Sequence, residues 1–153
     1  MNITRSSIDT QKGPDNAFTG DVYIDTVAAL EASARTSAAL VPFTPTARTA
    51  RHTHPCGQTI FVTEGIGRCR REGDPIEEIR PGDRVYFEPD ENHWHGAAPN
   101  RFMTHIAIQE SGENGPVTWG EHVTDQEYNA WTDDLGIPFS ATSPSAVRRS
   151  RDL

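Results

Sequence analysis

The sequence predicts a single all-β domain, a sandwich or barrel, from three observations. Short β-prone runs recur about every 8–12 residues between turn residues, which is the spacing typical of sandwiches and barrels. Proline and glycine are frequent, with 11 and 12 copies among 153 residues. Long helical patterns are scarce. A chain of this length suits one domain that buries its own core.

The N-terminal third predicts an arm and two strands. Residues 1–20 are polar and broken by glycine, so we expect an arm that lies on the body or on a partner subunit. Apolar and polar residues alternate over 21–27, which predicts a first strand. Residues 28–35 fit a short helical turn or a loop. Residues 39–43 form the second predicted strand.

The middle of the chain predicts a series of strands. Residues 59–63 are strongly β-prone, and Glu64-Gly65 follows as a tight turn. We therefore expect residues 66–71 to return as the hairpin partner of that strand. Further strands are predicted over 76–79, 84–87, 93–98 and 102–109.

The C-terminal end differs from the rest of the chain. Thr124 and Glu127 have the spacing of a capping box, with Thr124 as N-cap, so we expect a short helix through Trp131. We divide the chain into an N-terminal arm over 1–20, a barrel with its C-terminal helix over 21–135, and a flexible tail over 136–153.

Composition and charge argue against several classes of function. The net charge of −8 disfavours a nucleic-acid partner, because an acidic surface repels phosphate. No apolar run is long enough to span a membrane, and residues 1–20 lack the apolar core of a signal peptide. With only Cys56 and Cys69, we expect free thiols in a reducing cytoplasm, with pairing of Cys69 between subunits as the alternative.

Four of the six histidines form two pairs, His52/His54 and His93/His95. Residues two apart on a strand point to the same face, so each pair can direct both imidazoles to one interior point. Imidazole is the commonest side-chain ligand of divalent transition metals. The chain bends directly after His54, which allows Gln58 to return its amide oxygen to the same place. These residues predict a metal site.

These motifs resemble those of the cupin superfamily. The histidine pair at 52 and 54, followed by Gln58 and Gly65, resembles the first cupin motif with glutamine in place of the usual glutamate. Gly82-Asp83 to His93 resembles the second motif, and His93 is then the fourth metal ligand. The resemblance covers residues 38–110 and implies a jelly-roll barrel. Asp90 stands where a glycine is usual, and Ala97 where an asparagine is usual.

A closer resemblance is to the bacterial manganese-dependent cupin hydroxynitrile lyases, which cleave or form cyanohydrins with R selectivity. It is carried by GPDNAFTG, ARTARHTHPCGQT, EEIRPGD, HWHGAAP, MTHIAIQE and EHVTDQEY. The resemblance implies His52, His54, Gln58 and His93 as metal ligands. It also implies His95 and His105 as further active-site histidines, and Ala39, Val41 and Gln109 as pocket residues.

The strand around His105 gives two opposed predictions. Simple alternation would bury Phe102, Ile106 and Ile108 and expose His105. The family resemblance instead turns His105 and Gln109 inward, and we adopt that arrangement. The apolar outer face of this strand then needs a cover, from the C-terminal helix or another subunit.

The predicted function is metal-dependent cleavage or formation of cyanohydrins. Three histidines and one glutamine leave the charge of the metal uncompensated, which favours Lewis-acid chemistry. A cyanohydrin hydroxyl at an open coordination position would have a lowered pKa, and His105 first, His95 second, would act as general base. Phe43, Val41 and Met103 are expected to form an apolar wall for an aromatic aldehyde.

Two alternatives stay open at this point, a metal-dependent cupin dioxygenase or isomerase acting on a small aromatic or carbonyl substrate, and a non-catalytic small-molecule-binding cupin. The expected cofactor is one divalent metal ion per subunit, with manganese first and iron, zinc, nickel or cobalt as alternatives. The expected partners are a small-molecule substrate and further copies of the chain in a homodimer or homotetramer.

Overall fold

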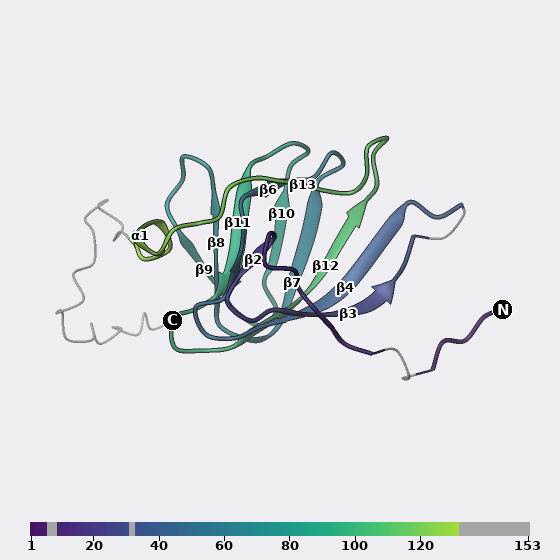
Figure 1. Ribbon diagram of the computed structural model, residues 1–153, viewed down its shortest axis with the longest axis horizontal. Helices are drawn as coiled ribbons and strands as arrows, with labels where there is room; N and C mark the ends of the chain where they lie inside the picture. The colour runs from purple at the N-terminus through teal and green to yellow at the C-terminus, as the bar shows by residue number, and fades with distance from the viewer. Residues whose placement is uncertain (6–8, 31–32, 132–153) are drawn as a thin grey trace, which may run out of the picture.

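The computed structural model describes residues 1–5, 9–30 and 33–131, and they form two antiparallel sheets that face each other (Figure 1). One sheet has the strand order β1-β3-β4-β12-β7-β10, with bounds Gln11–Lys12, Tyr23–Ala28, Thr36–Phe43, Met103–Glu110, Gln58–Gly65 and Arg84–Phe87. The second has the order β13-β6-β11-β5-β2, with bounds Thr118–Trp119, His52–Thr53, His93–Ala97, Arg48–Thr49 and Phe18–Thr19. In that sheet β8 (Gly67–Arg71) also pairs with β11, and β9 (Glu77–Ile79) pairs with β8.

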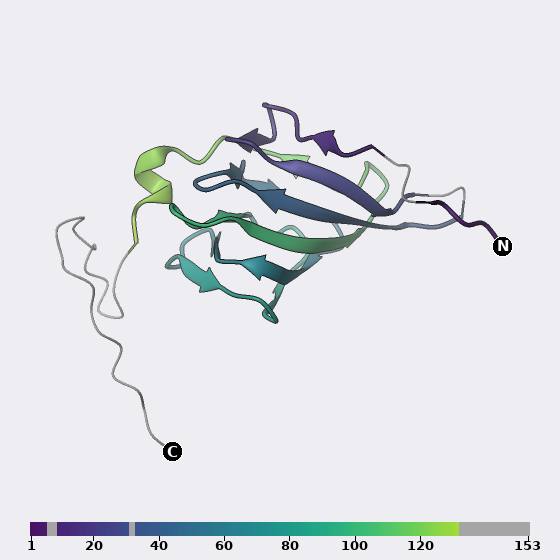
Figure 2. The same cartoon turned by 90° about the horizontal axis from the view of Figure 1, so that it is seen from below.

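The core lies between the inner faces of the two sheets, where alternate residues of each strand point inward. On β12, Met103, His105 and Ala107 are buried, whereas Ile108 is exposed. Strand β7 shows the same alternation, and β4 shows it at Val41 and Phe43 but not at Ala38, which is buried opposite Ile108. The six-stranded sheet therefore has one face toward the interior and one toward solvent. Figure 2 shows β3, β4 and β12 running side by side in it.

The predicted hairpin between residues 59–63 and 66–71 is wrong. Strand β7 pairs with β10 and β12, whereas β8 pairs with β9 and β11 in the opposite sheet. The chain crosses between the sheets just after Gly65, which has a φ of 77°. A Cβ atom there would lie 1.8 Å from the carbonyl oxygen of Phe102. Glycine at this position therefore permits a crossing, where the sequence pattern was interpreted as a tight turn.

The N-terminal arm predicted over 1–20 lies on the body of the barrel from Gln11 onward. Strand β1 pairs with β3, and β2 pairs with β5. Ala17 and Phe18 are buried in the main core, and the ring of Phe18 contacts that of Phe43 edge-on. These residues extend the folded domain beyond the boundary predicted at residue 21.

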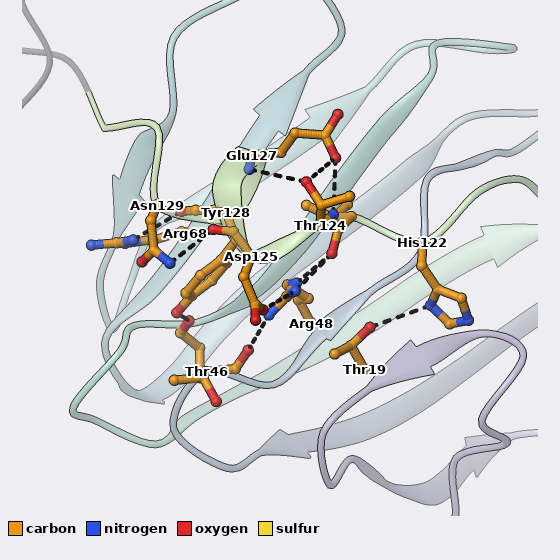
Figure 3. Close-up of polar contacts among 12 residues, drawn as sticks. Thr19, Thr46, Arg48, Arg68, His122, Thr124, Asp125, Glu127, Tyr128 and Asn129 are labelled. Atoms are coloured by element: carbon orange, nitrogen blue, oxygen red, sulfur yellow. Dashed lines mark hydrogen bonds and ion pairs between the residues drawn. The ribbon is translucent and has the colours of Figure 1, made fainter.

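The C-terminal helix α1 (Asp125–Tyr128) begins at the predicted capping box (Figure 3). Thr124 accepts from the Glu127 amide, and the Glu127 carboxylate accepts from the Thr124 amide. The helix ends at Tyr128, before the predicted limit of Trp131. The buried Arg48 guanidinium donates to the carbonyl of Val123 and to Asp125, which fixes the helix against β5. The tail predicted over 136–153 lies outside the described residues.

The two cysteines are free thiols. Cys56 is exposed, whereas Cys69 is buried, and burial raises the pKa of its thiol to about 12. A protonated and inaccessible thiol does not form disulfides readily, so the alternative of Cys69 pairing between subunits has no support. Across the described ranges, no helix has the length and apolar character needed to cross a bilayer.

Candidate metal centre and active site

Five buried histidines lie between the two sheets and define the candidate site. They come from three places in the fold: β6 and the residue after its end, β11, and β12. His52 on β6 is the register partner of His93 on β11, which places the two imidazoles beside each other with ring centroids 4.3 Å apart. The five are His52, His54, His93, His95 and His105. The sixth, His122, is exposed and contacts Thr19 (Figure 3).

Three of these histidines, His52, His54 and His93, share one hydrogen-bond arrangement. In each, Nδ1 lies within hydrogen-bond distance of a backbone carbonyl oxygen. The acceptors are Ala50, Pro116 and Glu91, at 2.9, 2.8 and 2.8 Å. A carbonyl only accepts, so Nδ1 carries the proton of the neutral ring and Nε2 keeps its lone pair. When a histidine binds a metal through one ring nitrogen, a hydrogen bond from the other ring nitrogen usually orients the ring.

The position of Gln58 supports a cation at the point where these lone pairs meet. Its Oε1 lies 3.2 Å from Nε2 of His93. Because both atoms are acceptors here, their approach is not a hydrogen bond and leaves two lone pairs directed at the same region. Nε2 of His54 is buried and has no hydrogen-bond partner among the described residues. A divalent ion would satisfy all of these atoms, so the residues present fit a metal.

His95 also faces this region but is oriented differently. Possible ligand atoms of His52, His93 and His95 all lie within 4.8 Å of one another, so three buried histidines form a cluster able to hold a metal ion. However, Nδ1 of His95 lies 3.1 Å from Nε2 of His105 rather than beside a carbonyl. Its tautomer therefore depends on that of His105. This cluster shares His52 and His93 with the ligand set inferred from the sequence.

Burial keeps all five interior imidazoles neutral. Desolvation lowers the pKa of His93 to about 4 and that of His105 to about 3. The pKa values of His52 and His95 are lowered well below the ordinary value, first by desolvation and then by neighbouring imidazoles. Desolvation also lowers the pKa of His54. Neutral rings are the form required of metal ligands and of proton acceptors.

A cavity of about 200 Å³ opens beside the histidines. Four predicted pocket residues line it: Ala39, Val41, Phe43 and Gln109. The structure places the fifth, Met103, in the fully buried core rather than in the wall. Both His95 and His105 line the cavity, so metal-ligand candidates and further imidazoles face one mostly apolar space.

Several lining residues are absent from the set inferred from the sequence. They are Phe18, Ile24, Thr49, Ala107, Pro116, Val117 and Trp119. Trp119 packs against His52, with ring centroids 4.8 Å apart, and against the edge of Phe18. It belongs to β13, a strand of two residues that no periodic pattern could reveal. Ile24 and Ala107 are the exceptions, since the alternation over 21–27 and the inward position adopted for His105 and Gln109 could have placed them on the inner face.

The inward position of His105 and Gln109 agrees with the family resemblance and not with simple alternation. His105 is fully buried, and Phe102 and Ile108 are exposed. Asp90, where a glycine is usual, has a φ of 61°. Its amide donates to the carbonyl of His54 at 2.9 Å, so this turn supports a ligand candidate through the backbone.

Fold and site together define a class of protein: a jelly-roll barrel with a histidine cluster inside. The chain belongs to the cupin family, and residues 39–106 match the cupin domain. It is 55% identical, over 117 residues, to an (R)-mandelonitrile lyase of Granulicella tundricola, a match that covers 76% of this chain and 89% of that protein.

Solved structures with the same architecture support the fold assignment. A cupin-like protein of Thermotoga maritima is 36% identical, with a TM-score of 0.77 over 85% of this chain and 99% of its own. The polyketide cyclase RemF of Streptomyces resistomycificus is 16% identical, with a TM-score of 0.65 over 85% and 91% of the two chains. The second similarity concerns the fold alone.

Proposed function

We propose that this protein is a metal-dependent hydroxynitrile lyase that cleaves R cyanohydrins to an aldehyde and cyanide, and forms them in reverse. The observation that carries the proposal is the cavity itself. It joins a cluster of neutral imidazoles, able to hold a metal, to an apolar wall containing Val41 and Phe43. The 55% identity to an (R)-mandelonitrile lyase supports the reaction and its stereochemistry.

We assign the ligand set to His52, His54, Gln58 and His93. The three histidines have Nδ1 committed to carbonyl oxygens, and Gln58 directs Oε1 toward His93. A divalent ion held by these four neutral groups would supply Lewis-acid polarisation of a substrate oxygen. Manganese is the metal implied by the family resemblance, and iron, zinc, nickel and cobalt also suit these ligands.

His95 and His105 are proposed to act as one proton acceptor. Between Nδ1 of His95 and Nε2 of His105 there is room for a single proton. When that proton is on Nδ1 of His95, Nε2 of His95 offers a lone pair to the site. Nε2 of His105 then accepts the hydrogen bond from Nδ1 of His95. The sequence interpretation preferred His105 as base and placed His95 second. The hydrogen bond between them makes the two rings dependent on each other.

The proposed reaction balances with this pair. The imidazole removes the hydroxyl proton of the cyanohydrin, and the oxygen electrons form the carbonyl bond. The bond between the carbinol carbon and the nitrile carbon breaks, and its electron pair leaves with cyanide. The imidazolium then returns the proton to cyanide, giving hydrogen cyanide. Since burial lowers the pKa of both rings, the imidazolium is short-lived and a strong acid.

Benzaldehyde release from racemic mandelonitrile tests the proposal. The protein is assayed as purified, after chelation, and after return of manganese or iron. We expect activity to fall on chelation, to return with metal, and to consume the R enantiomer. Activity at the blank rate in every preparation would contradict the lyase assignment. Oxygen uptake with iron and a panel of aromatic and carbonyl substrates would then support the oxygenase alternative. Metal binding without turnover would instead support a non-catalytic binding protein.

We also propose that the protein pairs with a second copy through the outer face of the six-stranded sheet. Leu40, Ile106 and Phe61 are neighbours across β4, β12 and β7, and Ile108 and Tyr86 extend the apolar area. An apolar patch of this kind is typical of a protein interface. Sedimentation should give at least twice the 16.9 kDa chain mass. A monomer at micromolar concentration would contradict this.

The free cysteines fit the reducing cytoplasm as the location.

A further inference from the structure

Three polar side chains form a row across the inner face of the six-stranded sheet. Gln109 on β12 is the register partner of Ser37 on β4 and of Gln58 on β7. The next row on the same face is apolar, with Ala107 between Ala39 and Ile60. Cross-strand neighbours on one face are in direct reach of each other. A polar row that ends at a candidate metal ligand therefore needs an explanation.

The hydrogen bonds along this row run in one direction. The hydroxyl of Ser37 donates to the backbone carbonyl of Gln109 at 3.5 Å, so its lone pair is available to the Gln109 side chain. Nε2 of Gln109 donates to that hydroxyl oxygen at 2.9 Å. Oε1 of Gln109 then accepts from Nε2 of Gln58 at 3.1 Å. Both ends of the Gln109 amide are used within the protein.

This direction determines which end of the Gln58 amide enters the site. With its nitrogen bound to Gln109, Gln58 presents Oε1 at 3.2 Å from Nε2 of His93 and 3.3 Å from Nε2 of His95. A rotated amide would present a nitrogen that donates instead, and an amide nitrogen does not ligate a divalent cation in its neutral form. An isolated glutamine has no preference between these two orientations.

We propose that Gln109, held by Ser37, is a positioning residue that keeps the oxygen of Gln58 directed at the metal. This inference deepens the proposed function, because it gives Gln109 a role in metal retention in place of direct contact with substrate. It rests on the ligand assignment and not on the identity of the substrate. It also explains why a glutamine can replace the usual glutamate of the first cupin motif, since a carboxylate has no orientation to fix.

Manganese titration of the chelated full-length protein, by calorimetry or chelator competition, tests the inference without any substrate. In Gln109→Met the acceptor for Gln58 is lost, and we expect manganese affinity to fall about 10–100-fold, the range typical of lost outer-shell partners. Gln109→Glu keeps an acceptor and should retain the wild-type affinity. Ser37→Ala removes the hydroxyl that accepts from Nε2 of Gln109, so the orientation of the Gln109 amide is less fixed. The manganese affinity of this variant should therefore lie between those of the two Gln109 variants.

Two further measurements separate this role from general damage and from the reaction. Urea unfolding of the chelated variants reports folding, and Gln109→Met and Gln109→Glu should unfold at similar urea concentrations. Wild-type affinity in Gln109→Met, equal losses in both Gln109 variants, or a wild-type protein that binds no manganese would each overturn the inference. A protein that shows the expected affinities and cleaves no mandelonitrile would contradict the lyase proposal alone.

Discussion

In the second half of β12, the two faces of the six-stranded sheet reverse the usual distribution of side chains, although the rest of the inner face is apolar core. On β12, the inner face carries His105 and Gln109, and the outer face carries Ile106 and Ile108. Ordinary domains bury their aliphatic residues, leave glutamine mostly exposed and bury histidine to an intermediate extent. Here polar groups are buried in pairs, each with a partner from another strand. Among the described residues two buried nitrogens are exceptions, Nε2 of His54, which lies among the candidate ligands, and Nδ1 of His105.

This reversal indicates that the two faces of β12 serve different purposes. Burying polar groups stabilises nothing by itself and costs free energy unless each group has a partner. The inner face accepts this cost and gains neutral imidazoles held in fixed positions. The outer face provides apolar area that a second copy could cover. The following changes test whether chemistry belongs to the inner face alone.

The largest effect is expected from His93→Ala. His93 is a member of both the proposed ligand set and the interior cluster. Losing it should weaken manganese binding more than about 100-fold, beyond the loss typical of outer-shell partners, and reduce mandelonitrile cleavage to the blank rate. His122→Ala is the matched control, because His122 is exposed and outside the cavity. Cleavage by His93→Ala at the wild-type rate would remove the interior cluster from the mechanism.

The next effect is expected from His105→Ala. A general base typically contributes about 10²–10⁴-fold to a rate, and we expect a loss of kcat in that range with manganese affinity preserved. Because His95 and His105 share a proton, the double variant should be no slower than the slower single variant. Steady-state kinetics of the three variants measure this. Fully additive losses, or lost metal in His105→Ala, would separate the two rings.

The interior histidines also predict how the chelated protein responds to acid. Their pKa values are lowered on folding, so below pH 6.5 the unfolded chain binds protons that the folded chain does not. Stability is therefore fully present above pH 6.5 and is lost as the pH falls toward 4, with His93 alone contributing roughly 3 kcal/mol.

Urea unfolding of the chelated protein at pH 7.5, 6 and 5 measures this loss. His93→Gln has one such group fewer and should show a shallower dependence on pH. Bound manganese should reduce the loss between pH 7.5 and 6, because it stabilises the unprotonated ligands. Equal pH dependence in the wild type and in His93→Gln would show that the buried imidazoles are not its source.

The sequence predicted most of the inner face because the chemistry is periodic. Histidines two apart on a strand indicate one face, and the motif spacing led to Gln58 and His93. Periodicity failed for His105, since burial of imidazole reverses the rule that apolar residues point inward. Periodicity also does not predict which distant strands pair, and the predicted hairpin between β7 and β8 was wrong for this reason. Gly65 predicts a backbone conformation and not which sheet the chain enters next.

The supporting residues of the site were the least predictable. Ser37 and Gln109 are 72 positions apart and meet only through the register of β4 and β12. Trp119 lies between the motifs MTHIAIQE and EHVTDQEY and belongs to neither, and Met103 lies in the buried core and not in the cavity wall. Local sequence gives the face on which such a residue lies, but strand register decides which side chain it contacts.

The smallest effect on activity is expected from the outer face. Phe61 is 42% exposed and lies in the apolar row with Leu40 and Ile106. In Phe61→Glu, a second copy would have to bury a carboxylate against an apolar surface, and the chain is already acidic. The assembly should dissociate, as sedimentation would show, with kcat per chain close to that of the wild type. Leu30→Glu is the control, since Leu30 is also exposed but lies in a loop away from this row. If Phe61→Glu lost activity in proportion to dissociation, the two faces would not be independent, because pairing would then be needed to keep the strands that carry Gln58 and His105 in register.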